Sequence, residues 1–109
     1  MYKKILHVED SSQWRSHVAN VLVPLGYQVT SFSNLTQAKQ AFANEAWDVV
    51  ICDGSVNGRG DGLDWADELY SQGQRVIVLA VFTRPRNQGI SFIDKGEFNS
   101  DDLLRLVEY

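Results

Sequence analysis

In this sequence of 109 residues, the side chains best suited to take part in a chemical reaction are carboxylates that follow short apolar runs. Glu9 and Asp10 come directly after Lys4–Val8, and Asp53 comes directly after Asp48–Cys52. Three carboxylates that converge repel one another and are driven towards protonation unless a cation lies between them. Hard oxygen ligands in this number suit Mg²⁺, which keeps several waters and commonly binds phosphate as well. An aspartate beside such an ion can attack phosphorus to form an acyl phosphate.

A hydroxyl and an ammonium group are placed in the same way on two further apolar runs. Thr83 comes directly after Val76–Phe82, and Lys95 ends the run Ile90–Lys95. The negative charge that develops on a phosphoryl group in transit is stabilised by a metal ion, a hydroxyl donor and a cation. If the fold brings these two residues to the three carboxylates, the chain has the parts of a phosphoryl-transfer site.

The elements that must position these residues alternate between strands and helices. Hydrophobic periodicity predicts strands at Lys4–Val8, Tyr27–Phe32, Asp48–Cys52, Val76–Phe82 and Ile90–Lys95, and helices at Ser11–Leu25, Leu35–Ala46, Leu63–Tyr70 and Asp101–Val107. This alternation favours an α/β fold with a doubly wound parallel sheet and helices on both faces. Ligands of such sheets bind at the carboxyl ends of the strands, which is where all five residues are predicted to lie.

Composition indicates one domain over residues 1–109 and excludes several classes of function. A hydrophobic content of 44% provides for a single core. The formal charge of −4, with Lys and Arg scattered, argues against direct binding of nucleic acid. The single cysteine, Cys52, excludes an internal disulfide and a cysteine zinc cluster. No apolar stretch approaches the roughly 20 residues of a membrane helix, so we expect a cytoplasmic domain without membrane association.

The ordered motifs resemble the response-regulator receiver domain, the CheY-like family. They are the acidic pair Glu9-Asp10 after an apolar strand, Asp53 after VVIC, Thr83 after VIVLAVF and Lys95 after SFID. The resemblance spans essentially the whole chain and implies a flavodoxin-like, five-stranded parallel sheet in the order 2-1-3-4-5. It also implies a two-component signalling role, in which a histidine kinase or a histidine phosphotransfer protein phosphorylates Asp53.

The resemblance further implies how the site is built. Glu9, Asp10, Asp53 and the backbone carbonyl of Ser55 would bind Mg²⁺. The loop after Asp53 is one residue longer than the common pattern and lacks its usual proline, which bears on the position of Ser55.

The resemblance also implies which residues contact the phosphoryl group and what phosphorylation does. Thr83 and Lys95 would contact the group, and Phe92 stands where the family keeps a switch aromatic that moves inward when the threonine engages phosphate. The phosphorylated chain would relay its signal through changed partner binding. It would not be an enzyme, apart from slow self-dephosphorylation.

Three residues depart from the family pattern and are expected to modulate the site. Arg84 follows Thr83 where a small residue is usual, and it would either clamp the phosphoryl group or obstruct it. Gly96 replaces the usual proline after Lys95, which leaves that turn loosely specified. Asp94 occupies a place where an apolar residue is usual, and it could pair with Lys95 and weaken its hold on phosphate.

The largest departure lies between the last two predicted strands. A parallel crossover normally takes about 10 to 12 residues or more and includes a helix, and TRPRNQG at 83–89 is too short for one. We therefore expect the fourth helix to be absent. The sheet face near residues 76–95 would lose its cover, so a homodimer or another partner is expected to dock there.

Several conspicuous residues are interpreted as structural. His7 lies within a predicted strand and is expected to be a core histidine satisfied by a hydrogen bond. Cys52 is expected to be an inert buried thiol. The tryptophans Trp14, Trp47 and Trp65 are interpreted as packing residues on helix faces and at helix ends.

Two other classes of function stay open at this level. A pseudo-receiver would act as a protein-interaction module without phosphorylation, and its departures at Arg84 and Gly96 would reflect lost chemistry. A Mg²⁺-dependent phosphatase with an aspartyl-phosphate intermediate would need a second acid-base carboxylate and a substrate cap, for which the chain has no room.

Overall fold

The strands form one parallel sheet. The structure is a computed structural model that describes residues 3–54, 61–81, 84–85 and 87–108. Its strands are β1 (Lys4–Val8), β2 (Gln28–Phe32), β3 (Val49–Asp53), β4 (Val76–Ala80) and β5 (Ser91–Asp94). They pair in parallel in the order β2-β1-β3-β4-β5. The predicted doubly wound fold and its strand order are confirmed.

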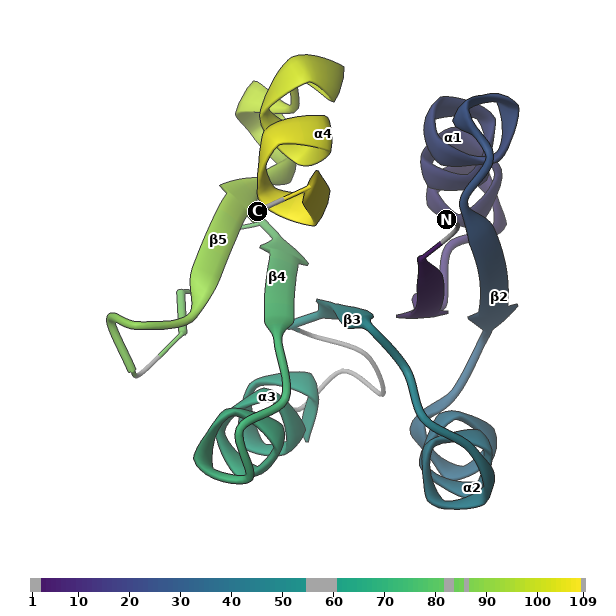
Figure 1. Cartoon of the computed structure of the whole chain (residues 1–109). Helices are drawn as coiled ribbons and strands as arrows, with labels where there is room; N and C mark the ends of the chain where they lie inside the picture. Colours follow the sequence, from purple (N-terminus) through teal and green to yellow (C-terminus); the bar gives the residue numbers. More distant parts are fainter. Residues whose placement is uncertain (1–2, 55–60, 82–83, 86, 109) are drawn as a thin grey trace.

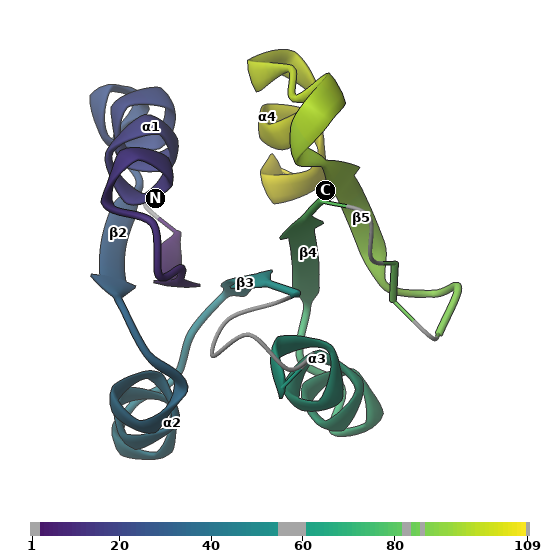
Figure 2. The same ribbon diagram turned by 180° about the vertical axis from the view of Figure 1, so that it is seen from behind.

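Helices cover both faces of the sheet. They are α1 (Ser12–Leu22), α2 (Leu35–Asn44), α3 (Asp61–Ser71) and α4 (Ser100–Glu108), with short 3₁₀ segments η1 (Val23–Leu25) and η3 (Lys95–Glu97). Figures 1 and 2 show α1 and α4 on one face and α2 and α3 on the other. Within the part of the chain that the structure describes, no helix is both long and apolar enough to cross a membrane.

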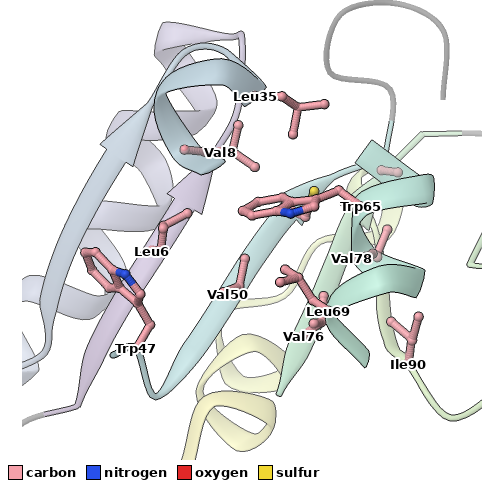
Figure 3. Packing of buried hydrophobic residues seen from close by; sticks show 14 residues of the cluster. Leu6, Val8, Leu35, Trp47, Val50, Trp65, Leu69, Val76, Val78 and Ile90 are labelled. Carbon is pink, nitrogen blue, oxygen red and sulfur yellow. The ribbon is translucent and has the colours of Figure 1, made fainter. Parts of the chain in front are cut away.

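The core lies in two layers, one on each side of the sheet. Every residue of β3 and β4 is buried, as expected for central strands covered on both faces. Figure 3 shows the layer under α2 and α3, where Leu69 of α3 lies close to Val76 of β4 and the Trp65 ring extends towards Val8 and Val50. The opposite layer joins the sheet to α1 and α4. The central strands are therefore fixed from both sides, and so are the residues at their carboxyl ends.

Local signals in the sequence set the start and end of α1. The hydroxyl oxygen of Ser11 accepts a hydrogen bond from the backbone N–H of Trp14 at 3.4 Å, which caps the helix. Gly26, at φ 97°, ends the 3₁₀ segment that follows α1. The cap places the acidic pair immediately before the helix, in the turn that leaves β1.

The ends of β4 and β5 differ from the prediction. β4 ends at Ala80, and Val81 after it is exposed, whereas Phe82 lies outside the described residues. β5 ends at Asp94, because the Asp94 carboxylate accepts a hydrogen bond from the backbone N–H of Gly96 at 2.8 Å and starts a 3₁₀ turn. Lys95 is consequently the first residue of that turn.

The expected loss of the fourth helix is confirmed for the residues described between β4 and β5. Asn87 there forms a turn, with its side-chain oxygen accepting from the N–H of Gly89 at 2.8 Å and its carbonyl from the N–H of Ile90 at 3.1 Å. Gly89 lies so close to Tyr70 of α3 that an added Cβ would be 2.0 Å from the phenol oxygen. The connection thus packs tightly against α3.

The prediction that this face is uncovered is wrong for β4. All five of its residues are buried: Val76, Val78 and Ala80 share a core layer with residues of α3, and the other two lie in the opposite layer. Ile90 is also buried, and Phe92 packs against the same core layer. The homodimer was predicted because this face was expected to be uncovered, so that reason no longer holds for β4. The homodimer itself stays a prediction.

Candidate functional site

The three carboxylates meet at the carboxyl ends of β1 and β3. These strands are neighbours, with Val8 paired to Cys52, so the next residues, Glu9 and Asp53, come side by side. Glu9, Asp10 and Asp53 each offer one carboxylate oxygen, and these oxygens lie within 4.8 Å of one another. Glu9 and Asp53 are buried and Asp10 is exposed. The convergence predicted from strand order is confirmed.

Glu9 is a fully buried carboxylate with an unusual charge balance. One of its carboxylate oxygens accepts a hydrogen bond from the backbone N–H of Ser11 at 3.2 Å. Burial raises the pKa of Glu9 to about 7; hydrogen bonding to Lys95 opposes this rise, and the charge of Asp53 adds to it. Negative charge is therefore in excess at this point, and a second cation beside Glu9 would stabilise its ionised form.

Lys95 comes to the carboxylates from the turn after the edge strand β5. Its ammonium nitrogen lies 2.6 Å from Glu9 Oε1 and 3.7 Å from Asp53 Oδ1, and its side chain is only 9% exposed. β5 runs parallel to β4 despite the short connection, which brings Lys95 to the carboxylate edge. Lys95 thus lies at the edge of the sheet where its place at the end of the last predicted strand put it.

Two residues that the sequence interpretation left out of the site contact it directly. The guanidinium of Arg15 donates hydrogen bonds to the backbone carbonyls of Glu9 at 2.8 Å and Asp10 at 3.1 Å. The ring of Trp14 lies 5.1 Å from the Lys95 ammonium, measured to the ring centroid. Their position in the first turn of a helix that starts just after the acidic pair is the signal that could have indicated them.

The contacts of the predicted modulators lie outside the carboxylate group. The guanidinium of Arg84 lies over the ring of Phe92, 5.1 Å from its centroid, at the edge strand β5. The expectation that Asp94 pairs with Lys95 is wrong, because the Asp94 carboxylate instead accepts from the N–H of Gly96. This hydrogen bond specifies the turn that a proline usually sets in the family.

Two predicted site residues are not placed. Ser55, the expected carbonyl ligand, and Thr83, the expected hydroxyl contact and switch residue, lie outside the described residues. The described part of the site therefore consists of the three carboxylates, Lys95, and the groups around them.

His7 departs from its predicted environment. It is fully buried, and neither ring nitrogen has a hydrogen-bond partner among the described residues, so the expectation of a satisfied histidine is wrong. Two residues before Glu9 on β1, it lies on the same face of the sheet, in the layer under α1. Burial, together with the positive charges of Lys95 and Arg15, lowers the pKa of His7 to about 3. The imidazole is neutral at physiological pH.

The donor set fits a magnesium ion. Three carboxylate oxygens grouped within 4.8 Å are hard ligands of the kind that Mg²⁺ binds, and the exposed side of the group at Asp10 admits water. Burial and the charge of Asp53 raise the pKa of Glu9, so a cation bound beside it would stabilise its ionised form. Glu9, Asp10 and Asp53 are thus the described residues that could hold such an ion.

Comparison with solved structures shows the same architecture in signalling proteins. A chain of the structure of histidine kinase ThkA in complex with response regulator protein TrrA is 26% identical, with a TM-score of 0.81 over 97% of this chain and 96% of that chain. NtrX from Brucella abortus is 27% identical with a TM-score of 0.83, and this chain spans 27% of its length. A signal receiver domain from Pseudomonas fluorescens Pf-5 has a TM-score of 0.85 at 20% identity, which shows a shared fold.

Comparison of the sequence itself identifies the family. The chain has no significant match among curated proteins. The family model described as the response regulator receiver domain matches residues 5–98, a range that includes both the acidic pair and Lys95. With the carboxylates and the lysine assembled on a sheet of the corresponding strand order, the chain belongs to the response regulator receiver domain family.

Proposed function

We propose that Asp53 accepts a phosphoryl group from a histidine kinase or a histidine phosphotransfer protein, in a step that depends on Mg²⁺. The observation that carries this proposal is the grouping of Asp53 with Glu9, Asp10 and Lys95. The carboxylate oxygens lie within 4.8 Å of one another, and the ammonium is 3.7 Å from Asp53. The likeness to a chain from a kinase–regulator complex supports a histidine kinase as the class of partner.

The transfer is a displacement at phosphorus. A carboxylate oxygen of Asp53 forms a bond to the phosphorus of a phosphohistidine, and the P–N bond breaks with its electron pair passing to the imidazole nitrogen. The product is an acyl phosphate, and nothing is oxidised or reduced. Lys95 offsets charge on the phosphoryl oxygens, and its position beside Asp53 is suited to that role. Bound Mg²⁺, held by Glu9, Asp10 and Asp53, would offset the remaining charge.

The output is a change in partner binding, and catalytic turnover is not part of the proposal. The proposed switch consists of Thr83 and Phe92. Of these two, Phe92 is described, and the guanidinium of Arg84 lies over its ring. The acyl phosphate would be lost only by slow hydrolysis. We place this function in the cytoplasm, with protein partners and without direct contact to nucleic acid.

Intact-protein mass spectrometry tests the proposal. The chain is incubated with a small phosphoramidate donor and Mg²⁺, beside Asp53→Asn and a sample containing a chelator. A single phosphoryl adduct that disappears in both controls is expected. An adduct that persists in Asp53→Asn would reject Asp53 as the acceptor, and an adduct that persists with chelator would reject the metal dependence.

The alternative is a pseudo-receiver that docks partners without phosphorylation. The observation in its favour is the contact of 2.6 Å between Lys95 and Glu9, which already supplies the buried carboxylate with a cation. This function predicts no adduct and no binding of Mg²⁺ in a titration followed by tryptophan fluorescence. Measurable Mg²⁺ binding together with an adduct would exclude it.

A further inference from the structure

We propose that Trp14 is a positioning residue that holds the ammonium group of Lys95 beside Asp53. This inference deepens the proposed function and rests on it. The Lys95 nitrogen lies 5.1 Å from the centroid of the Trp14 ring, within the range of a cation–π interaction. Tryptophan is the aromatic side chain that binds cations best, and the contact gains strength here because Lys95 is only 9% exposed.

The other two groups around the Lys95 ammonium have competing roles. Glu9, at 2.6 Å, would bind Mg²⁺, and Asp53, at 3.7 Å, would carry the phosphoryl group. When both carboxylates are engaged, the Trp14 ring is the one partner among the described residues that neither the ion nor the phosphate occupies.

Trp14 is itself fixed by an aromatic cluster of Trp14, His17 and Phe98. The His17 ring stacks on Trp14 with centroids 5.4 Å apart, and the Phe98 ring meets it edge-on at 5.2 Å. His17 and Phe98 contact each other at 4.7 Å. The ring of Trp14 therefore has a defined orientation although it lies at the edge of the site.

The same cluster fixes the chain on the other side of the lysine. Phe98 follows Lys95 by three residues, and its backbone N–H donates to the Lys95 carbonyl at 3.4 Å. Trp14 thus contacts both the side chain of Lys95 and the end of the turn that Lys95 begins. The lysine is therefore held relative to α1 at two points, through its side chain and through the end of its turn.

Two variants of Trp14 separate positioning from simple packing. Trp14→Leu keeps an apolar side chain but removes the aromatic face, and Trp14→Phe keeps a smaller face. We expect the rate of phosphorylation by phosphoramidate with Mg²⁺ to fall about tenfold in Trp14→Leu and to stay within about threefold in Trp14→Phe. A control is Trp47→Leu, which removes a similar contact, with Lys4 at 4.9 Å, near the ends of β1 and β3 that lie opposite the site. Its rate should equal the wild-type rate when circular dichroism shows it folded.

A second measurement does not depend on phosphorylation. In proton–carbon correlation spectra, the ε-methylene protons of Lys95, identified by their absence in Lys95→Met, should be shifted upfield by the ring current of Trp14. We expect the shift to be lost in Trp14→Leu, to be kept in part in Trp14→Phe and to be unchanged in Trp47→Leu.

Each outcome decides the matter. A wild-type rate in Trp14→Leu, an equal loss in both Trp14 variants, or an unshifted Lys95 signal in the wild type would overturn the positioning role. If wild-type protein forms no adduct at all, the proposed function fails. The Lys95 signal then still shows whether Trp14 holds the ammonium.

Discussion

At the scale of single residues, the site is a balance between buried charges. Glu9 and Asp53 are almost completely buried, and the Lys95 ammonium lies between them. Burial is the main reason why the pKa of Glu9 is raised to about 7 although a lysine is in contact, and the negative charge of Asp53 adds to the rise. An incoming divalent ion would displace Lys95 from Glu9 and leave the ammonium available to a phosphoryl group. Binding of the proposed ion at Glu9 would thus change the placement of the lysine.

Arg15 is expected to tune metal affinity without touching the metal. Its guanidinium holds the backbone carbonyls of Glu9 and Asp10 at 2.8 and 3.1 Å and so orients both acidic side chains. Substituting such outer groups commonly costs about 10- to 100-fold in metal affinity, and we expect a loss of about tenfold for Arg15→Met. Isothermal titration with Mg²⁺ measures it. Arg105→Met, which removes an exposed pair with Asp102, is the control, and equal affinities in the two variants would contradict the role of Arg15.

His7 is expected to make the folded state sensitive to acid. The unfolded chain binds a proton at its ordinary pKa of 6.5, whereas the folded state resists protonation until about pH 3. Stability attributable to His7 is therefore lost as the pH falls below 6.5, by about 1.4 kcal/mol per pH unit. In His7→Leu this loss disappears, and the variant should be at least as stable as the wild type at neutral pH because two unpartnered polar atoms are removed.

Urea unfolding at several pH values measures this difference. Glu9 acts in the opposite sense, since its raised pKa makes stability fall as the pH rises from 4.5 to about 7, and it does so in both proteins. Subtracting the wild-type stability from that of His7→Leu isolates the histidine. Ile5→Leu, on the same face of β1, is the control and should follow the wild-type pH profile. Parallel profiles for wild type and His7→Leu would refute the prediction.

Strand order determines the position of some site residues and not of others, and only the former can be predicted from the sequence. Glu9, Asp53 and Lys95 come together because parallel strands end at one edge, so their meeting follows from the order of the strands. Trp14 and Arg15 reach the site only through the rotation of α1 above the sheet, which periodicity leaves uncertain by a residue or more. The lack of partners for His7 depends on every neighbour at once and could not be read from local pattern.

At the scale of elements, the connection from β4 to β5 shows what replaces a missing helix. Val76, Val78 and Ala80 are buried in the core layer that contains residues of α3, and Ile90, at the end of the turn that begins at Asn87, is buried in the same layer. The sequence showed correctly that seven residues at 83–89 cannot contain the helix and its turns. It did not show that Tyr70 of α3 would pack against the short connection, because that contact depends on how α3 lies on the sheet.

The contact between Tyr70 and Gly89 is expected to fix this connection. A Cβ at residue 89 would lie 2.0 Å from the Tyr70 phenol oxygen and 2.7 Å from the ring carbon that carries it. Gly89→Ala must therefore displace the partly exposed end of Tyr70, and we expect a loss of about 1 kcal/mol or less in the free energy of unfolding. In the Tyr70→Ala background the same substitution should cost much less. Urea unfolding of the four proteins forms the cycle, and an equal cost in both backgrounds would show that the contact is not what constrains Gly89.

At the scale of the whole molecule, the site joins three parts of the fold. β1 with the start of α1 supplies Glu9 and Asp10, β3 supplies Asp53, and η3 after β5 supplies Lys95. Figure 1 shows that α1 and α4 flank one face of the sheet, and the core layer beneath them contains residues of both helices and of the central strands. The site exists only in the folded chain, because only folding brings these three parts together. A ligand that binds there must therefore stabilise the folded state.

Binding of Mg²⁺ should therefore raise thermal stability, and more so as the pH rises. Metal binding requires the ionised form of Glu9, whose pKa is about 7 in the metal-free protein. From about pH 6 to about pH 8 the ionised fraction of Glu9 rises roughly tenfold, so the Mg²⁺ affinity should rise by a similar factor. At a concentration about 100 times Kd the ion should add about 2.7 kcal/mol to the free energy of unfolding.

Differential scanning calorimetry with Mg²⁺ or chelator at both pH values measures this stabilisation. The variant Glu9→Gln should bind Mg²⁺ more weakly and lose the pH dependence. Equal affinity at both pH values in the wild type would mean that Glu9 keeps its proton or its lysine when the ion binds, and the metal would then be held by Asp10 and Asp53 without it.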